Sequence, residues 1–328
     1  MKTFFFTLLF GGFLILNLGF TNRGSEFTLT CKMDGCEAVD SLFIFEHDGF
    51  LFKKIGSTPK LEDGSYLFKM PMTETPRFYY VGMGSTNLKP IILGTEEEVR
   101  LAGHCLNFKV ASIQNSQINQ GYGRLKYKMS QHKNEIKSIV QQFPLAMQDS
   151  FQLAQLDKQM RKIDREKIEL LDSLKRTNPY LGHIAAFNTY LSFRHNNVKK
   201  YPNEIQYFVD EYFKYVDWTN KDYEYLAWVY EGTKAYATTL SLSRLQIPHE
   251  QHLAVLENIL KRIPDTSRTY QLAYGGILAG LQSQNHGNYI ALGEKYLQKF
   301  GREDMRTTAA INRQIRNLKS NIIGGEAP

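Results

Sequence analysis

The spacing of hydrophobic residues changes near residue 115 and divides the chain into two parts. From residue 24 to 110, short hydrophobic runs alternate with polar residues at period two, as in Phe27–Cys31 and Ser41–Glu46. Turn residues separate the runs, and the sequence His47-Asp48-Gly49 follows one of them directly. This pattern is typical of short β-strands joined by turns. About seven such runs occur, and their spacing predicts a small antiparallel β-sandwich over residues 24–110.

Residues 117–320 show three- and four-residue spacing instead. Leu156, Met160 and Ile163 recur at this spacing within a charged segment, which predicts one helix from Pro144 to Arg176. Other segments have helical patterns bounded by proline, glycine or paired asparagine, namely 180–193, 204–216, 222–242, 249–263, 267–284, 289–300 and 304–319. The predicted fold class is therefore α+β, with an N-terminal β-sandwich followed by an all-α helical bundle or array.

Residues 1–22 have the composition of a targeting segment. Lys2 precedes seventeen mostly apolar residues, Phe4–Phe20, which is the pattern of a secretory signal peptide cleaved near Asn22. The apolar run also reaches the lower length limit of a membrane-spanning helix, so an uncleaved anchor stays open as an alternative. In both cases we expect an exported protein that meets the membrane only through this segment.

Composition and charge narrow the class of protein. The chain has 328 residues, of which 42% are hydrophobic and 22% charged, which argues against a disordered chain and a polytopic membrane protein. The net charge of +7 is unevenly placed, because residues 24–110 carry nine basic and twelve acidic side chains. The charged face of the helix predicted from residue 144 holds both signs, as in Lys158 and Glu169. Mixed signs favour a solvated surface, so no nucleic-acid partner is predicted.

Three cysteines are present, Cys31, Cys36 and Cys105. Export would place them in an oxidising compartment, where thiols pair. Cys31 and Cys36 flank a turn at Asp34-Gly35 and are candidates for a disulfide, with Cys105 left as a free thiol. The sequence leaves open whether this bridge forms. Its C-x4-C spacing differs from the C-x-x-C of thiol-exchange enzymes, so a structural role is favoured over a catalytic one.

Other candidate chemistry is sparse. His249 and His252 lie on one face at the start of a predicted helix, where two metal ligands could sit. The pair lacks the H-E-x-x-H spacing of zinc proteases and no third ligand is evident, which favours a solvent-facing pair. The sequence also has no G-x-S-x-G, P-loop or G-x-G-x-x-G motif. No catalytic residue, metal or cofactor is therefore predicted.

The order of parts resembles the N-terminal portion of a known family. The β-region ends in Lys89–Gly94 and Glu98–Gly103, the helical region contains Phe213–Trp218, and the chain ends in Ile322–Pro328. This arrangement resembles the β-module and helical domain of Bacteroidetes-type TlpA/ResA-like thioredoxin-family disulfide reductases. The last segment is similar to the I-G-x-x-A-P entry into a thioredoxin domain, so the resemblance implies that residues 321–328 are a linker into a domain absent from this sequence.

The resemblance implies a function as well as a domain order. In that family the activity lies in a downstream W-C-x-x-C motif, which this sequence lacks. We therefore expect a non-catalytic accessory module of the periplasm or cell envelope that presents or positions protein substrates for a thioredoxin-like partner. An alternative hypothesis is that the chain is a fragment of a periplasmic thiol–disulfide oxidoreductase whose catalytic domain is missing. A third is binding of an envelope glycan or peptide by exposed aromatic residues such as Tyr79, Tyr80 or Trp218.

Overall fold

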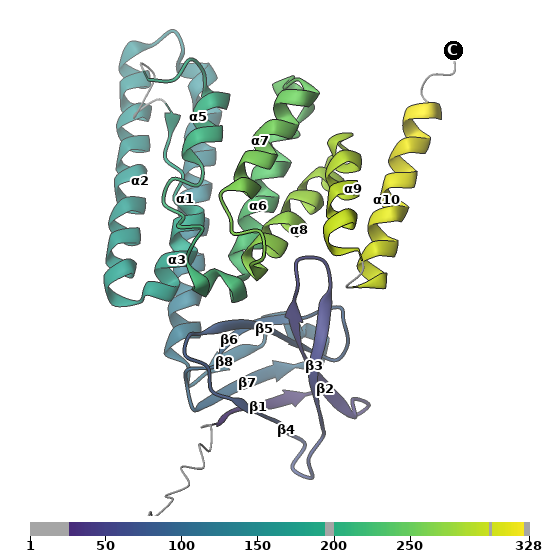
Figure 1. Cartoon of the computed structure of the whole chain (residues 1–328). Coiled ribbons are helices and arrows are strands. Elements are labelled where there is room, and N and C mark those ends of the chain that lie inside the picture. The colour runs from purple at the N-terminus through teal and green to yellow at the C-terminus, as the bar shows by residue number, and fades with distance from the viewer. Residues whose placement is uncertain (1–25, 194–199, 302–303, 325–328) are drawn as a thin grey trace, which may run out of the picture.

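The computed structural model describes residues 26–193, 200–301 and 304–324, in which strands come first and helices follow (Figure 1). The fold is α+β, as the sequence predicts. The predicted signal peptide or anchor over residues 1–22 lies outside the described residues. Within the three described ranges, no helix combines the length and apolar character needed to cross a bilayer.

Eight strands form two four-stranded sheets. One sheet has the order β4-β1-β7-β8 and the other the order β3-β2-β5-β6. Every one of the seven predicted runs contains a strand, and the structure adds the short strand β8. The bounds are β1 (Glu26–Asp34), β2 (Ser41–His47), β3 (Phe52–Pro59), β4 (Tyr66–Pro71), β5 (Arg77–Gly82), β6 (Lys89–Leu93), β7 (Glu98–His104) and β8 (Ser112–Gln114). A 3₁₀ helix, η1 (Cys105–Val110), separates the last two strands.

One strand pair runs in the direction that the sequence analysis did not predict. β1 and β7 are parallel, with Thr28 opposite Glu98 and Asp34 opposite His104. The first sheet is therefore mixed, and the prediction of a purely antiparallel β-region is wrong. Parallel neighbours need a long crossover connection, which strands β2 to β6 supply here. The alternation of apolar and polar residues along β1 shows which face of the strand is buried. It does not show that β7, far along the chain, is its neighbour.

The two sheets contribute to one apolar core. Alternate residues of β1 are buried, among them Phe27 and Leu29, and they belong to the same cluster as Leu42 of β2 and Val81 of β5. The period-two pattern of the sequence is thus the pattern of inward-facing side chains. We call residues 26–114 the β-module.

The helices stand on one side of the β-module (Figure 1). α1 and α2 form a long hairpin at one end of the row, and α10 lies at the other end. The helices are α1 (Gln117–Ala146), α2 (Ser150–Thr177), α3 (Pro179–Asn188), α5 (Glu204–Glu211), α6 (Ala227–Leu240), α7 (His249–Lys261), α8 (Arg268–Ser283), α9 (Asn288–Phe300) and α10 (Met305–Gly324), with 3₁₀ turns η2 (Lys221–Tyr225) and η3 (Ser243–Leu245). α10 includes residues 321–324, so the first half of the expected linker is helical, whereas 325–328 lie outside the described residues.

The predicted helix from Pro144 to Arg176 is wrong at its start. Pro144 lies in the last turn of α1, and α2 begins only after Asp149. The Asp149 side chain accepts hydrogen bonds from the backbone N–H groups of Phe151 (2.9 Å) and Gln152 (3.0 Å), which makes it the N-cap of α2. Proline is favoured in the first turn of a helix, so the sequence alone misassigned Pro144 to the start of α2.

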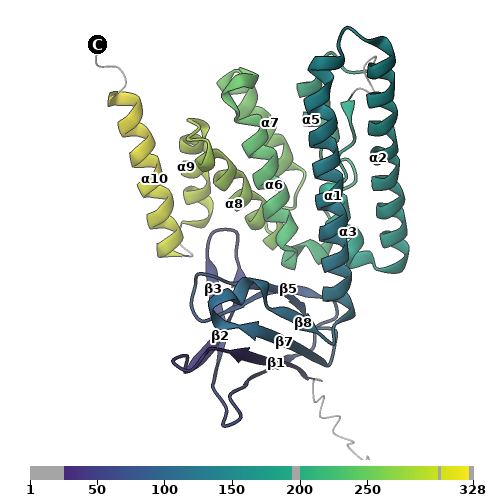
Figure 2. The ribbon, with the colours of Figure 1, turned by 180° about the vertical axis from the view of Figure 1, so that it is seen from behind.

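The β-module and the helices share a second apolar core. Phe78 of β5 and Ile92 of β6 belong to the cluster formed by α1, α3, α6, α8 and their neighbours. The Phe78 ring contacts those of Tyr122 (centroids 5.3 Å apart) and Tyr180 (6.2 Å). We call this contact region the seam; Figure 2 shows it from behind, where α1 rises directly from the sheets.

Two glycines allow the closest approach across the seam. Gly49, in the turn between β2 and β3 with φ +105°, lies against Gly275 in the middle of α8. A Cβ atom on residue 275 would overlap the carbonyl oxygen of Gly49 and lie 2.6 Å from its carbonyl carbon. Beside this contact the Phe50 ring packs on Tyr296 of α9 (4.6 Å). The β2–β3 turn is thus inserted between side chains of the helical region.

We expect Gly275→Ala to lower the free energy of unfolding by about 2 kcal/mol or more, because both contacting atoms belong to the backbone and have little freedom to move. Gly123→Ala in α1 is the matched control, since its Cβ would meet nothing within 4 Å. This control should be neutral or stabilising by up to about 1 kcal/mol. Urea unfolding measures both values, and equal midpoints for the two variants would contradict the close approach.

Candidate binding cleft

A cleft runs between the α1–α2 hairpin and the chain that follows α3. Residues 189–193, which we call the strap, pass in front of α2 after α3 ends at Asn188. α2 faces the strap with residues spaced by three and four, namely Asp157, Met160, Asp164 and Lys167, and α1 does so with Ile136, Val140 and Phe143. That spacing places each set on one side of its helix.

Polar contacts fix the strap to α2. Asp164 is only 5% exposed, and its carboxylate accepts hydrogen bonds from the Ser192 backbone N–H (3.0 Å to Oδ2) and hydroxyl (2.5 Å). One turn along α2, Lys167 donates from Nζ to the Tyr190 carbonyl oxygen (2.7 Å). Burial lowers the pKa of Lys167, and the nearby Asp164 opposes this shift. The two charged groups therefore hold the strap at a fixed distance from the helix.

Aromatic side chains support the strap from its other side. The Tyr190 ring lies near Tyr207 (centroids 5.6 Å apart) and Phe208 (5.3 Å) of α5, and the Tyr207 hydroxyl donates to the Leu191 carbonyl oxygen (3.2 Å). Burial of the Tyr190 hydroxyl raises its pKa above the usual range, so it remains protonated. The strap is thus held between α2 and α5.

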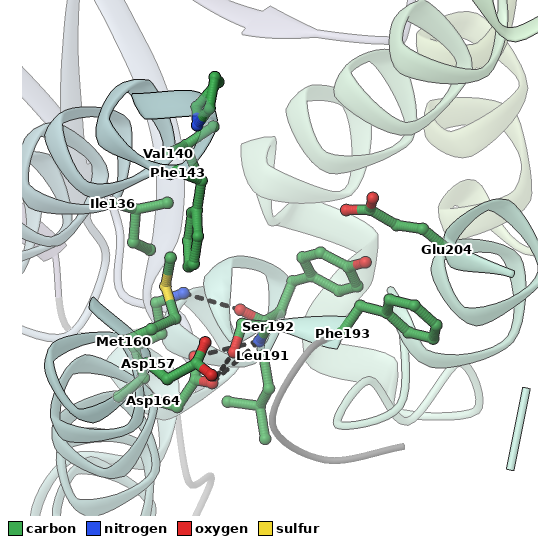
Figure 3. A pocket seen from close by; sticks show the side chains of 13 residues that line it. Ile136, Val140, Phe143, Asp157, Met160, Asp164, Leu191, Ser192, Phe193 and Glu204 are labelled. Atoms are coloured by element: carbon green, nitrogen blue, oxygen red, sulfur yellow. Dashed lines mark hydrogen bonds between the residues drawn. The ribbon is translucent and has the colours of Figure 1, made fainter. Parts of the chain in front are cut away.

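The space enclosed by these elements is a cavity of about 730 Å³. Figure 3 shows side chains from α1, α2, the strap and α5 arranged around it, with Glu204 on the side opposite Met160. We call it the acidic cavity because three of its lining residues are carboxylic acids. The lining residues are Ile136, Val140, Phe143, Pro144, Asp157, Met160, Asp164, Lys167, Tyr190, Leu191, Ser192, Phe193 and Glu204. Its size and mixed lining are those of a ligand pocket.

A second cavity of about 540 Å³ adjoins the first along the hairpin. The two share Ile136, Lys167 and Tyr190 as lining residues. The second contains basic side chains in an apolar setting, and we call it the basic cavity. Its other lining residues are Leu125, Lys126, Met129, Ser130, His132, Lys133, Leu170, Ala185, Asn188, Thr189 and Trp228. Sequence analysis missed both cavities, because residues from α1, α2, α3 and the strap meet only in the folded chain.

The disulfide joins Cys36 to Cys105, so the predicted Cys31–Cys36 pairing is wrong. Cys31 is an inward-facing residue of β1 and is fully buried, whereas Cys36 and Cys105 come just after the ends of β1 and β7. Because these two strands are parallel and in register up to Asp34 and His104, their ends bring Cys36 and Cys105 together, with Cα atoms 5.5 Å apart.

The free thiol is therefore Cys31 rather than Cys105. Burial raises the pKa of the Cys31 thiol to about 12, which keeps it protonated at neutral pH. A protonated, fully buried thiol is a poor nucleophile. Cys36 and Cys105 are also buried. Their bond fastens the chain after β1 to the start of η1.

His249 and His252 meet an asparagine and a third histidine. Asn288 donates from Nδ2 to Nδ1 of His252 (3.0 Å) and accepts at Oδ1 from Nδ1 of His249 (3.0 Å). The remaining nitrogen of His252 donates to the Ser241 hydroxyl (3.1 Å), and the His286 ring stacks on His252 (4.1 Å). Across the described ranges, no group of three histidine, cysteine or carboxylate residues is placed to hold a metal ion. The expectation of a solvent-facing pair is wrong for His252, which is 1% exposed, whereas His249 is exposed. His286, which sequence analysis did not select, is half-buried and accepts from the Asn288 backbone N–H (3.2 Å).

Two of the three aromatic residues considered for glycan stacking are buried. Tyr79 is 3% exposed and Trp218 is 4% exposed, so neither presents a ring to a ligand. Tyr80 is half-buried and packs against Phe52 (4.8 Å) in the β-module. These residues contribute to packing and do not form a common surface.

Comparison of the chain with protein-family models, with curated proteins and with solved structures finds no match. The cleft is therefore the feature of the molecule from which a function is inferred.

The pKa of His252 predicts a loss of stability in mild acid. Burial, with smaller contributions from His286 and His249, lowers this pKa from 6.5 to about 4 in the folded chain. The unfolded chain therefore binds a proton between pH 6.5 and 4 that the folded chain does not, so stability present above pH 6.5 is lost as the pH falls. The size of the pKa shift sets an upper limit of about 3 kcal/mol on the free energy of unfolding that is lost through protonation of His252.

We expect His252→Gln to be less stable than the original chain at pH 7 and to show a shallower decline in stability between pH 6.5 and 4. Urea unfolding at several pH values measures the decline. Parallel stability curves for the two proteins would show that His252 is not the group responsible.

Proposed function

We propose that this chain is a non-catalytic binding module of the cell envelope, which holds an extended segment of a protein substrate within a thioredoxin-like disulfide reductase system. The observation that supports this most is the acidic cavity. Its polar groups Asp164 and Ser192 are already hydrogen-bonded to each other, and the α1 side chains that line it are apolar. Such a pocket suits an apolar side chain that enters from outside. We also propose that the two sheets face each other as a β-sandwich, since both contribute to one core.

Exposed apolar residues next to the cavity favour a protein as the ligand. At the turn between α1 and α2, Leu145 is 85% exposed, Met147 69% and Phe151 71%. Val140, which lines the cavity, is 52% exposed. Neighbouring exposed apolar side chains of this kind mark interaction surfaces. We infer that a bound segment fills the cavity and contacts the turn.

The cysteines are consistent with a partner that carries the redox chemistry. Cys36 and Cys105 are bonded to each other within buried surroundings, and the Cys31 thiol is buried and protonated. In the proposed function, this chain contributes affinity for the substrate and a thioredoxin-like partner exchanges the disulfide.

The test is binding of an unfolded protein, with reduced and carboxymethylated α-lactalbumin as the fluorescent probe. We expect the purified full chain to bind it, and Val140→Asp to weaken binding at least about tenfold, because a charge in the apolar wall opposes its burial. Val110→Asp is the matched control, since Val110 is 77% exposed at the end of η1 in the β-module. The control should change affinity by less than about twofold.

Fluorescence anisotropy measures the three dissociation constants. Absence of binding up to about 100 μM would contradict the proposal, because the binding free energy would then be weaker than about −5.5 kcal/mol. An equal loss for Val140→Asp and Val110→Asp would show that charge, and not the cleft, governs binding.

A further inference from the structure

The basic cavity differs from the acidic cavity in the sign of its charge. Lys126, Lys133 and Lys167 line it together with His132, whereas none of its described lining residues is an aspartate or glutamate. Opposite charge therefore divides one continuous cleft into two halves, and the shared residue Lys167 stands at the division.

Lys167 brings a poorly solvated ammonium group to this cavity. Its Nζ has three N–H donors, and one of them bonds to the Tyr190 carbonyl oxygen. Asp164, the carboxylate whose charge acts on Lys167, accepts from the backbone N–H and hydroxyl of Ser192. A largely desolvated ammonium with spare donors is stabilised by an anion that enters the cavity.

The neighbouring carboxylates do not neutralise the positive charge of the basic cavity. Glu166 lies beside His132 (3.3 Å), but it also pairs with Lys128 (2.9 Å) and Lys162 (3.8 Å). Lys133 is exposed and has no ion-pair partner among the described residues. The mouth of the cavity thus carries excess positive charge, which attracts an anionic ligand.

Most of the remaining lining residues of the basic cavity are apolar, and they extend along α1. Met129, Leu170 and Trp228 contribute to it, and the α1 residues that line it run from Leu125 to Ile136. Eleven helical steps correspond to about 16 Å, enough for an extended peptide of about five residues or an aliphatic chain of similar length. The cavity therefore suits a ligand with an apolar body and an acidic end.

We propose that the basic cavity binds a carboxylate carried on an apolar chain, with Lys167 as its ionic anchor and Lys133 at its mouth. Two sources share this chemistry, a free aliphatic acid and the C-terminal carboxylate of an apolar peptide. The inference does not depend on the proposed function, because Val140 and the α1–α2 turn take no part in it; the two proposals share only the residues that line both cavities, Ile136, Lys167 and Tyr190.

Trp228 provides the signal for a test. The chain has two tryptophans, and Trp218 is buried in the helical core whereas Trp228 lines the basic cavity. Decanoate, below its micellar concentration, is titrated against decanol, which has the same chain without the charge. In parallel, a leucine-rich pentapeptide with a free C-terminus is titrated against its C-terminal amide.

We expect a saturable change in fluorescence that Trp228→Phe abolishes and Trp218→Phe preserves. In at least one arm, the acid should bind about tenfold or more tightly than its neutral counterpart, and added salt should reduce the difference. The arm that responds identifies the source. If neither acid binds, or if acids and neutral counterparts bind equally, the proposal is overturned.

Substitutions then locate the anchor. Lys167→Met keeps the length of the side chain without its charge, and it should reduce the preference for the acid to about twofold or less. Because Lys167 also holds the strap, Lys133→Gln provides a second test and should weaken binding of the acid about threefold. Lys137→Gln, one turn further along α1 and outside the cavity lining, is the matched control and should leave affinity unchanged. Equal affinities for the Lys133→Gln and Lys137→Gln variants would overturn the assignment of the charge to this cavity.

Discussion

The side-chain amide of Asn119 determines where the helical region leaves the sheet, and the cleft depends on that point. Asn119 accepts from the Ile92 backbone N–H (2.9 Å) and donates to its carbonyl oxygen (2.6 Å), so it pairs with the edge strand β6 as a neighbouring strand would. Ser116 caps the same helix and donates to Glu96. Because these groups are buried, the direction of α1 is fixed at its first turn.

A fixed first turn has consequences at the far end of the helix. α1 has 30 residues and is about 45 Å long, so a small rotation at its base would move the cavity-lining residues Ile136 and Val140 by several ångströms. The aromatic contacts of Phe78 and the backbone contact of Gly49 with Gly275 oppose such rotation. In this account the β-module is a rigid base, and the distal half of the α1–α2 hairpin is the part that meets a ligand.

The sequence predicts local features well and long-range ones poorly. The alternation of Phe27, Leu29 and Cys31 identified β1 and its buried face, because strand period is a local property. Nothing local predicts that β1 and β7 are parallel neighbours, and so the Cys36–Cys105 bond was missed. Asp149 is a residue type that often caps a helix, and it marks the true start of α2. The prediction placed that start at Pro144 instead. The cleft itself depends on Lys167 and Asp164 reaching a strap some 25 residues later, which no spacing rule reports.

The shared apolar core makes the β-module and the helices one cooperative body, which holds the cleft in shape. Scanning calorimetry of the full chain tests it most directly. A shared core predicts one transition, with the calorimetric enthalpy equal to the van't Hoff enthalpy. Two separate transitions, with one part unfolding while the other stays folded, would contradict the claim, because the seam would then contribute too little to fix α1 and the cleft.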